Sequence, residues 1–147
     1  KQFCTLSPIP GFRHWLKKAL MDINSVLITD QEKLILQRIN DDYWYNNPVL
    51  SVELQPLLMR LCAHYLNNEK RDQAPLDPVA RFHLGNGASI EQLNWLGDRS
   101  DNGLKQSAAI LVNYRYEINR VEENHEAFIN GDHISSSKKF RTLLEQQ

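Results

Sequence analysis

Residues 109–118 read Ala-Ile-Leu-Val-Asn-Tyr-Arg-Tyr-Glu-Ile, the clearest secondary-structure pattern in the sequence. Every second residue from Ile110 on is apolar or aromatic, and the residues between them are polar from Asn113 on. This is the period-two pattern of a strand with one buried face. Tyr114 and Tyr116 fall on the more apolar face, while Asn113 and Arg115 fall on the other. The stretch therefore predicts a β-strand and requires a sheet in the fold.

Two further strands are expected on either side of a long helical region. Residues 1–6 are short, apolar and partly β-branched, and residues 89–96 have the second strand-like pattern. The first strand ends at residues 7–11, Ser-Pro-Ile-Pro-Gly, where two prolines forbid regular structure and fix a turn. Residues 98–107 predict a loop that continues into a short helix.

The region between these strands has helical periodicity. Apolar residues recur at helical spacing over residues 12–23 and again over about 52–66. Between them, the capping box that runs from Thr29 to Glu32 opens another helix, which ends near the aromatic residues 43–45. Residues 67–75 are polar and predict a solvated loop.

A short helix is expected between Asp77 and Gly85. Asp77 is a good N-cap, Pro78 fits the first helical position, and Gly85 suits the helix end. His83 then lies in the last turn, where the helix dipole favours the imidazolium and tends to raise the pKa of His83. The sequence around His83 alone leaves open whether it is a core residue or a catalytic one.

The tail from about residue 121 to 145 predicts two helices, broken at residues 130–132 and with Ser135 or Ser136 capping the second. The order of elements is then strand, three helices, short helix, strand, short helix, strand and helices. This order indicates a mixed α/β (α+β) fold, with a helical insertion over about residues 12–75.

Composition restricts the classes of partner. The 147 residues are enough for one domain, and 17 basic residues balance 18 acidic ones for a net charge of −1. The basic residues are scattered and no apolar run has membrane-spanning length, so we expect no nucleic-acid and no membrane partner. Cys4 and Cys62 have neither metal-site spacing nor a disulfide framework, which favours reduced thiols in an intracellular protein. Because the chain starts at Lys1 inside strand-like sequence, we expect a fragment of a longer protein.

Few patterns in the sequence point to a site. The five histidines include no H-x-x-x-H pair, so no metal site is expected. Gly85-Asn86-Gly87 is too short for a phosphate-binding loop, and no G-x-S-x-G segment is present. Ser7 lies where a strand meets a rigid turn, so it either caps the turn or donates a hydrogen bond in a proton relay to a histidine.

Six segments, in the same order and over nearly the whole chain, resemble the malonyl-CoA decarboxylase family. They are Thr-Leu-Ser-Pro-Ile-Pro-Gly-Phe at 5–12, Asp-Pro-Val-Ala-Arg-Phe-His-Leu-Gly-Asn-Gly-Ala at 77–88, Leu-Asn-Trp-Leu-Gly-Asp at 93–98, Gly-Leu-Lys-Gln-Ser at 103–107, Val-Asn-Tyr-Arg-Tyr at 112–116 and Asn-His-Glu-Ala at 124–127. The resemblance implies an acetyltransferase-like mixed sheet, of which residues 1–147 are the C-terminal part of the catalytic domain. The family's N-terminal helical domain and the upstream segment that cradles the CoA diphosphate do not match any part of the chain.

The resemblance also implies an activity and a set of site residues. It implies a carbon–carbon lyase of fatty acid metabolism that converts malonyl-CoA to acetyl-CoA and carbon dioxide without a metal or organic cofactor. Ser7 and His83 match the catalytic residues, and Tyr116 and Asn86 are expected to contact the substrate. We further expect a cytoplasmic homo-oligomer, with Leu6, Phe82 and Leu84 as an apolar surround that desolvates the departing carboxylate.

Two alternatives remain at this point. An acyltransferase of the same fold would transfer the acyl group to an acceptor instead of releasing carbon dioxide. A non-catalytic CoA-binding or oligomerisation fragment would use its helices as a scaffold, with anchors at Trp15, Tyr43, Trp44 and Tyr45, although the sequence favours a core position for each of these aromatics.

Overall fold

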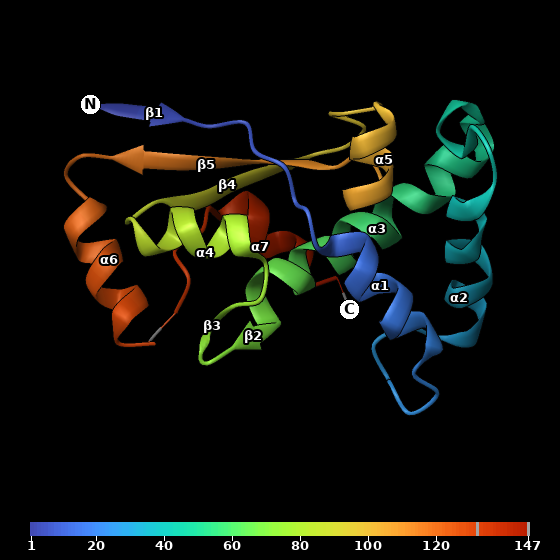
Figure 1. The fold of residues 1–147 in the computed structure, drawn as a ribbon, viewed down its shortest axis with the longest axis horizontal. Coiled ribbons are helices and arrows are strands. Elements are labelled where there is room, and N and C mark those ends of the chain that lie inside the picture. Colours follow the sequence, from blue (N-terminus) through green and yellow to red (C-terminus); the bar gives the residue numbers. More distant parts are fainter. Residues whose placement is uncertain (132, 147) are drawn as a thin grey trace.

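A three-stranded antiparallel sheet runs along one side of the computed structural model, which describes residues 1–131 and 133–146 (Figure 1). Its strands are β1 (Gln2–Cys4), β5 (Leu111–Glu117) and β4 (Ser89–Asn94), in the order β1-β5-β4. The strand predicted over 109–118 is therefore confirmed as β5, and it is the central strand of the sheet.

The two faces of β5 differ as its sequence predicts. Val112 and Tyr114 are fully buried on one face. On the other face Asn113 accepts a hydrogen bond of 2.9 Å from Asn94, and Arg115 pairs with Glu91 at 3.4 Å. An antiparallel sheet with one covered and one open face produces this alternation.

The N-terminal segment follows β5 beyond the end of β1. Thr5 donates its backbone N–H to Tyr114 at 2.8 Å, and Ser7 and Val112 exchange backbone bonds of 2.8 and 3.0 Å. Pro8 and Pro10 fix φ on both sides of Ile9, the next residue whose N–H could face β5, and the pairing ends at Ser7. Ser7 is thus the last residue of this segment that β5 holds in place.

Helices occupy most of the region between β1 and β4. They are α1 (Phe12–Met21), α2 (Asp30–Leu36), the 3-10 turns η1 (Gln37–Asn40) and η2 (Trp44–Asn46), and α3 (Pro48–Asn68). The capping box is present, because Thr29 Oγ1 accepts from Glu32 N at 3.1 Å and Glu32 accepts from Thr29 N at 3.0 Å. The reading of this region as an insertion stays a prediction.

Helix α3 begins four residues earlier than its apolar pattern predicts. Asn47 Oδ1 accepts hydrogen bonds of 3.1 Å from the N–H groups of Val49 and Leu50, and Pro48 takes the first helical position. This N-cap lies between the aromatic residues 43–45, where the preceding helix was expected to end, and the apolar pattern of α3. The same Asn-Pro pair both ends the preceding turn and starts α3.

The prediction of a solvated loop over residues 67–75 was wrong. This segment contains a hairpin of β2 (Lys70–Arg71) and β3 (Ala74–Pro75). Asp72 and Gln73 form its two-residue turn with φ of 53° and 69°. Two successive positive φ values match the twist of a tight hairpin, and the polar composition concealed it.

The remaining helices are α4 (Pro78–Gly85), α5 (Asp101–Ser107), α6 (Val121–Ile129) and α7 (Lys138–Leu144). Helix α4 has the predicted bounds. The predicted cap of α7 was wrong, because Ser137 rather than Ser135 or Ser136 accepts from Phe140 N, at 3.0 Å. Ser135 and Ser136 instead run beside β4, where Ser135 O accepts from Ile90 N at 2.9 Å. Of the expected break at 130–132, residue 132 lies outside the described residues.

One apolar core joins the sheet to the helical region. It includes Leu54, Leu58 and Leu61 of α3, Phe140 of α7 and Val112 of β5, all fully buried. In Figure 1, α6 lies at one end of the sheet, and α1 and α2 lie at the opposite end of the molecule. Within residues 1–131 and 133–146, none of the helices combines the length and the apolar character needed to cross a bilayer.

Candidate active site

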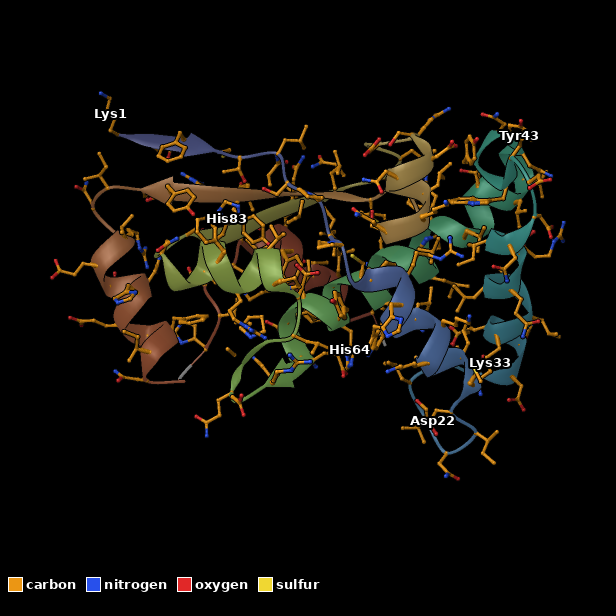
Figure 2. The ribbon with its side chains drawn as sticks, viewed as in Figure 1. Lys1, Asp22, Lys33, Tyr43, His64 and His83 are labelled. Atoms are coloured by element: carbon orange, nitrogen blue, oxygen red, sulfur yellow. The ribbon has the colours of Figure 1, made fainter. Side chains whose placement is uncertain are left out.

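Three of the four predicted site residues meet in the structure. Ser7 Oγ lies 3.3 Å from His83 Nε2, and His83 Nδ1 lies 2.6 Å from the hydroxyl of Tyr116. They come from the end of the N-terminal extended segment, from α4 and from β5. Figure 2 shows the side chain of His83 between α4 and the strands. Both ring nitrogens of one histidine are thus hydrogen-bonded to hydroxyl groups.

The position of Ser7 is fixed by backbone and side-chain contacts. Its backbone bonds to Val112 hold the residue against β5, and Pro8 restricts the chain that follows. Its Oγ also lies 2.8 Å from Thr5 Oγ1, and only 5% of the residue is exposed. The hydroxyl of Ser7 therefore lies between a second hydroxyl and an imidazole, which is the arrangement that a proton relay requires.

The surroundings of His83 favour its neutral form. Its ring stacks on Tyr114 with a centroid distance of 4.5 Å, and Phe82 contacts it edge-on. Burial lowers the pKa of His83 below its ordinary value of 6.5. The expectation that the helix dipole raises this pKa was wrong. The last carbonyls of α4, including that of His83, accept bonds from the N–H groups of Asn86 and Ala88, so they favour an imidazolium less.

Tyr116 presents its hydroxyl to His83 while its ring packs elsewhere. The ring stacks on Phe3 with a centroid distance of 4.9 Å and an interplanar angle of 11°. Burial raises the pKa of Tyr116 above its ordinary value of 10.0, so the phenol keeps its proton at neutral pH. A neutral phenol can donate to His83 Nδ1 or accept from it.

Asn86, the fourth predicted site residue, is placed differently. It is the C-cap of α4, where its N–H donates to the carbonyls of Phe82 and His83 at 3.2 and 3.1 Å. Its side chain is exposed and takes no part in the hydrogen bonds among Ser7, His83 and Tyr116. Its expected contact with substrate stays a prediction.

Two residues of the site were missed from the sequence. Thr5 extends the hydroxyl chain to Ser7, and Tyr114 provides the surface on which His83 stacks. The hydroxyl of Tyr114 is buried without a hydrogen-bond partner among the described residues. A usable signal existed, because Thr5 precedes Ser7 by two residues and Tyr114 precedes Tyr116 by two, so each pair shares one strand face.

The expected apolar surround is only partly present. Leu84 is buried, whereas Leu6 and Phe82 are each 64% exposed. The prediction that all three enclose the site was therefore wrong for this chain. Along the extended segment successive side chains point to opposite faces, so Leu6 faces away from the covered side to which Ser7 points.

Among the residues that the structure describes, no three His, Cys, Asp or Glu side chains gather as a possible metal site. Cys4 is exposed and Cys62 is buried, and both are free thiols. The metal and cofactor independence implied by the resemblance stays a prediction. What the geometry does offer is a continuous series of hydroxyl and imidazole groups that can pass a proton.

Comparison with known proteins identifies the family. The sequence model described as malonyl-CoA decarboxylase C-terminal domain matches residues 1–147. The chain belongs to this family. Malonyl-CoA decarboxylase from Anser anser anser, named as mitochondrial, is 35% identical over 98% of the chain and 32% of its own length. The resemblance found in the sequence is thereby confirmed.

Solved structures of the family have the same fold. The crystal structure of malonyl-CoA decarboxylase from Rhodopseudomonas palustris superposes with a TM-score of 0.93 at 40% identity, over 97% of this chain and 33% of that one. The enzyme from Agrobacterium vitis gives a TM-score of 0.92 at 37% identity, over 97% of this chain and 35% of that one. The chain thus spans about a third of the length of the malonyl-CoA decarboxylases it matches.

Proposed function

We propose that the complete protein containing this chain converts malonyl-CoA to acetyl-CoA and carbon dioxide, and that Ser7, His83 and Tyr116 act in the reaction. The observation that carries the proposal is the hydrogen-bonded series Ser7–His83–Tyr116 in a chain of the malonyl-CoA decarboxylase family. Metal independence, an acetyltransferase-like fold and a homo-oligomeric state are part of the same proposal, as is a cytoplasmic location.

The chemistry sets three requirements. Loss of carbon dioxide leaves a negative charge that is shared between C2 and the thioester oxygen. The site must therefore hold the carboxylate out of the thioester plane, stabilise the enolate oxygen and return a proton to C2. Ser7 suits the first two tasks, because a hydroxyl donates a hydrogen bond to a carboxylate or an enolate without adding charge.

For the third requirement, Ser7 delivers the proton to C2, and His83 and Tyr116 resupply it. We assign the neutral tautomer in which Tyr116 donates to His83 Nδ1 and His83 Nε2–H donates to Ser7 Oγ. Burial supports this assignment, since it lowers the pKa of His83 and raises that of Tyr116. Both groups are then neutral at pH 7, and every proton in the series points toward Ser7.

Proton transfer through this series leaves the charges balanced. Ser7 gives its hydroxyl proton to C2 and receives the proton of His83 Nε2, while His83 Nδ1 takes the proton of Tyr116. The enolate carbon of a thioester is a far stronger base than a phenolate, so the transfer is downhill. The phenolate of Tyr116 then takes a proton from water, and the net reaction consumes one proton for each carbon dioxide released.

The proposal is tested by incubating the complete protein with malonyl-CoA and no acyl acceptor. We expect acetyl-CoA and carbon dioxide in equal amounts. An acyltransferase would leave malonyl-CoA intact until an acceptor is added, and a non-catalytic fragment would leave it intact in either case. Either result would contradict the decarboxylase assignment.

A further inference from the structure

Asp77 joins the two segments that carry Ser7 and His83. Its side chain is fully buried, and Oδ2 accepts hydrogen bonds of 3.2 and 3.1 Å from Val79 N and Ala80 N, at the start of α4. Oδ1 accepts from Gly11 N at 3.3 Å and from the hydroxyl of Tyr65 at 3.1 Å. Only the Val79 and Ala80 bonds are needed to cap the helix.

The Gly11 bond reaches the turn that follows Ser7. Three residues separate Ser7 from Gly11 along the chain, and two of them, Pro8 and Pro10, are prolines. Because proline fixes φ, this turn transmits a displacement of Gly11 to Ser7 instead of absorbing it. On the other side, α4 connects Asp77 rigidly to His83 in its last turn.

Gly11 packs closely against the hydroxyl of Tyr65 and Oδ1 of Asp77. A Cβ at Gly11 would lie 2.2 Å from the hydroxyl oxygen of Tyr65, which is far inside van der Waals contact. Tyr65 is itself almost fully buried, and its ring packs against Phe12 and Trp15. The turn, helix α3 and helix α4 therefore meet at a single carboxylate.

We propose that Asp77 is a positioning residue, which holds the turn after Ser7 at a fixed distance from α4 and thereby sets the contact between Ser7 and His83. This inference rests on the proposed function of that pair. The Ser7 Oγ–His83 Nε2 distance of 3.3 Å is already at the long end for a hydrogen bond. A small shift of the turn is therefore enough to separate the two groups.

Asp77→Asn in the complete protein tests the role with little change of shape. Asparagine is as good an N-cap as aspartate, so its oxygen can keep the two bonds to α4. In place of Oδ1, asparagine then presents its NH2 group, which cannot accept a hydrogen bond from Gly11 N–H. The Tyr65 hydroxyl can turn to accept a hydrogen bond from this NH2 group. We expect kcat to fall by about tenfold or more, because misplacement of reacting groups by even 1 Å is costly, with KM changed by less than about twofold.

The control removes a helix cap that lies away from the site. Ser100 caps α5 by accepting from Gly103 N at 3.1 Å, and Ser100→Ala removes that bond. We expect Ser100→Ala to lower the unfolding temperature and to keep kcat.

For Asp77→Asn we also expect the midpoint of the acid limb of kcat/KM to move to higher pH, since a looser turn lets water reach His83. A mere loss of folded protein would instead lower the rate by the same factor at every pH and leave this midpoint unchanged.

Ser7→Ala is measured in the same series to separate the two proposals. Full activity of Asp77→Asn beside an inactive Ser7→Ala would overturn the positioning role alone. The positioning role would also be overturned if Asp77→Asn and Ser100→Ala, at the same drop in unfolding temperature, showed the same loss of rate. Activity retained by Ser7→Ala would overturn the proposed function, and the positioning role with it. If Asp77→Asn does not fold, Gly11→Ala decides, because its Cβ would push the turn away from Tyr65 and Asp77 at the same contact. The kcat of Gly11→Ala should then fall at nearly constant KM, and an unchanged kcat would overturn the positioning role.

Discussion

At the scale of single residues, the proposed chemistry depends on the charge state of His83. Two influences oppose each other: the end of α4 favours the imidazolium, and burial against Tyr114 disfavours it. Burial prevails, and the pKa of His83 is lowered. The capped carbonyls of α4 explain why the helix dipole is the weaker influence.

This balance predicts a pH dependence of activity. Protonation of His83 places protons on both ring nitrogens, so Tyr116 can no longer donate to Nδ1 and the relay stops. The kcat/KM of the complete protein should therefore rise with pH through a pKa below 6.5 and reach a plateau at neutral pH. A rate that instead falls as the pH rises through that range would show that the imidazolium is the working form.

A second residue-scale prediction concerns Tyr116→Phe. This change removes the hydroxyl that lies 2.6 Å from His83 Nδ1 and keeps the ring that stacks on Phe3. The kcat should fall by roughly a hundredfold, as expected for loss of one group in a proton relay. Tyr43→Phe, at a tyrosine that is 69% exposed, is the matched control and should keep wild-type turnover. Equal turnover of both variants would remove Tyr116 from the mechanism.

At the scale of elements, local signals in the sequence account for some parts of the fold and miss others. Helix α4 has its predicted bounds because Asp77 and Pro78 act on neighbouring backbone alone, although the glycine with positive φ after this helix is Gly87 rather than Gly85. The hairpin of β2 and β3 was missed because positive φ at Asp72 and Gln73 is not required by those residue types. The start of α3 was misplaced because its cap precedes its apolar pattern.

The turn from α4 into β4 gives a prediction at this scale. Gly87 has φ of 90°, and a Cβ there would lie 2.3 Å from the carbonyl oxygen of Val121. Gly87→Ala should lower the free energy of unfolding by about 3 kcal/mol, because backbone strain and a backbone clash add. Gly131→Ala is the control: its φ is 71°, its nearest contact is 3.4 Å, and its cost should be about 1 kcal/mol. Equal losses in chemical denaturation would show that the clash with Val121 is relieved.

At the scale of the whole molecule, the site depends on contacts between distant parts of the chain. Periodicity assigned the faces of β5 correctly, but it could not give the register that brings Ser7 opposite Val112. The meeting of Ser7, His83 and Tyr116 was available only from the family resemblance. Thr5 and Tyr114 were missed because their roles arise from packing against partners far along the sequence.

The shared core predicts that the helical region and the sheet unfold together. Leu54 of α3 is fully buried, and Leu54→Ala should lower the free energy of unfolding by about 3 kcal/mol. The hydrogen exchange of β5 amides should accelerate in the same variant. Leu34→Ala, at a residue that is 69% exposed, should change neither quantity. Unchanged protection of β5 in Leu54→Ala would mean that α3 opens independently of the sheet.

The central claim is that Ser7 and His83 carry out the chemical step. The most direct measurement is the turnover of malonyl-CoA by Ser7→Ala and His83→Asn in the complete protein. Each variant should lose at least about a hundredfold in kcat, as expected when one proton donor or oxyanion donor is removed. Near-wild-type kcat in either variant, with or without a raised KM, would contradict the account.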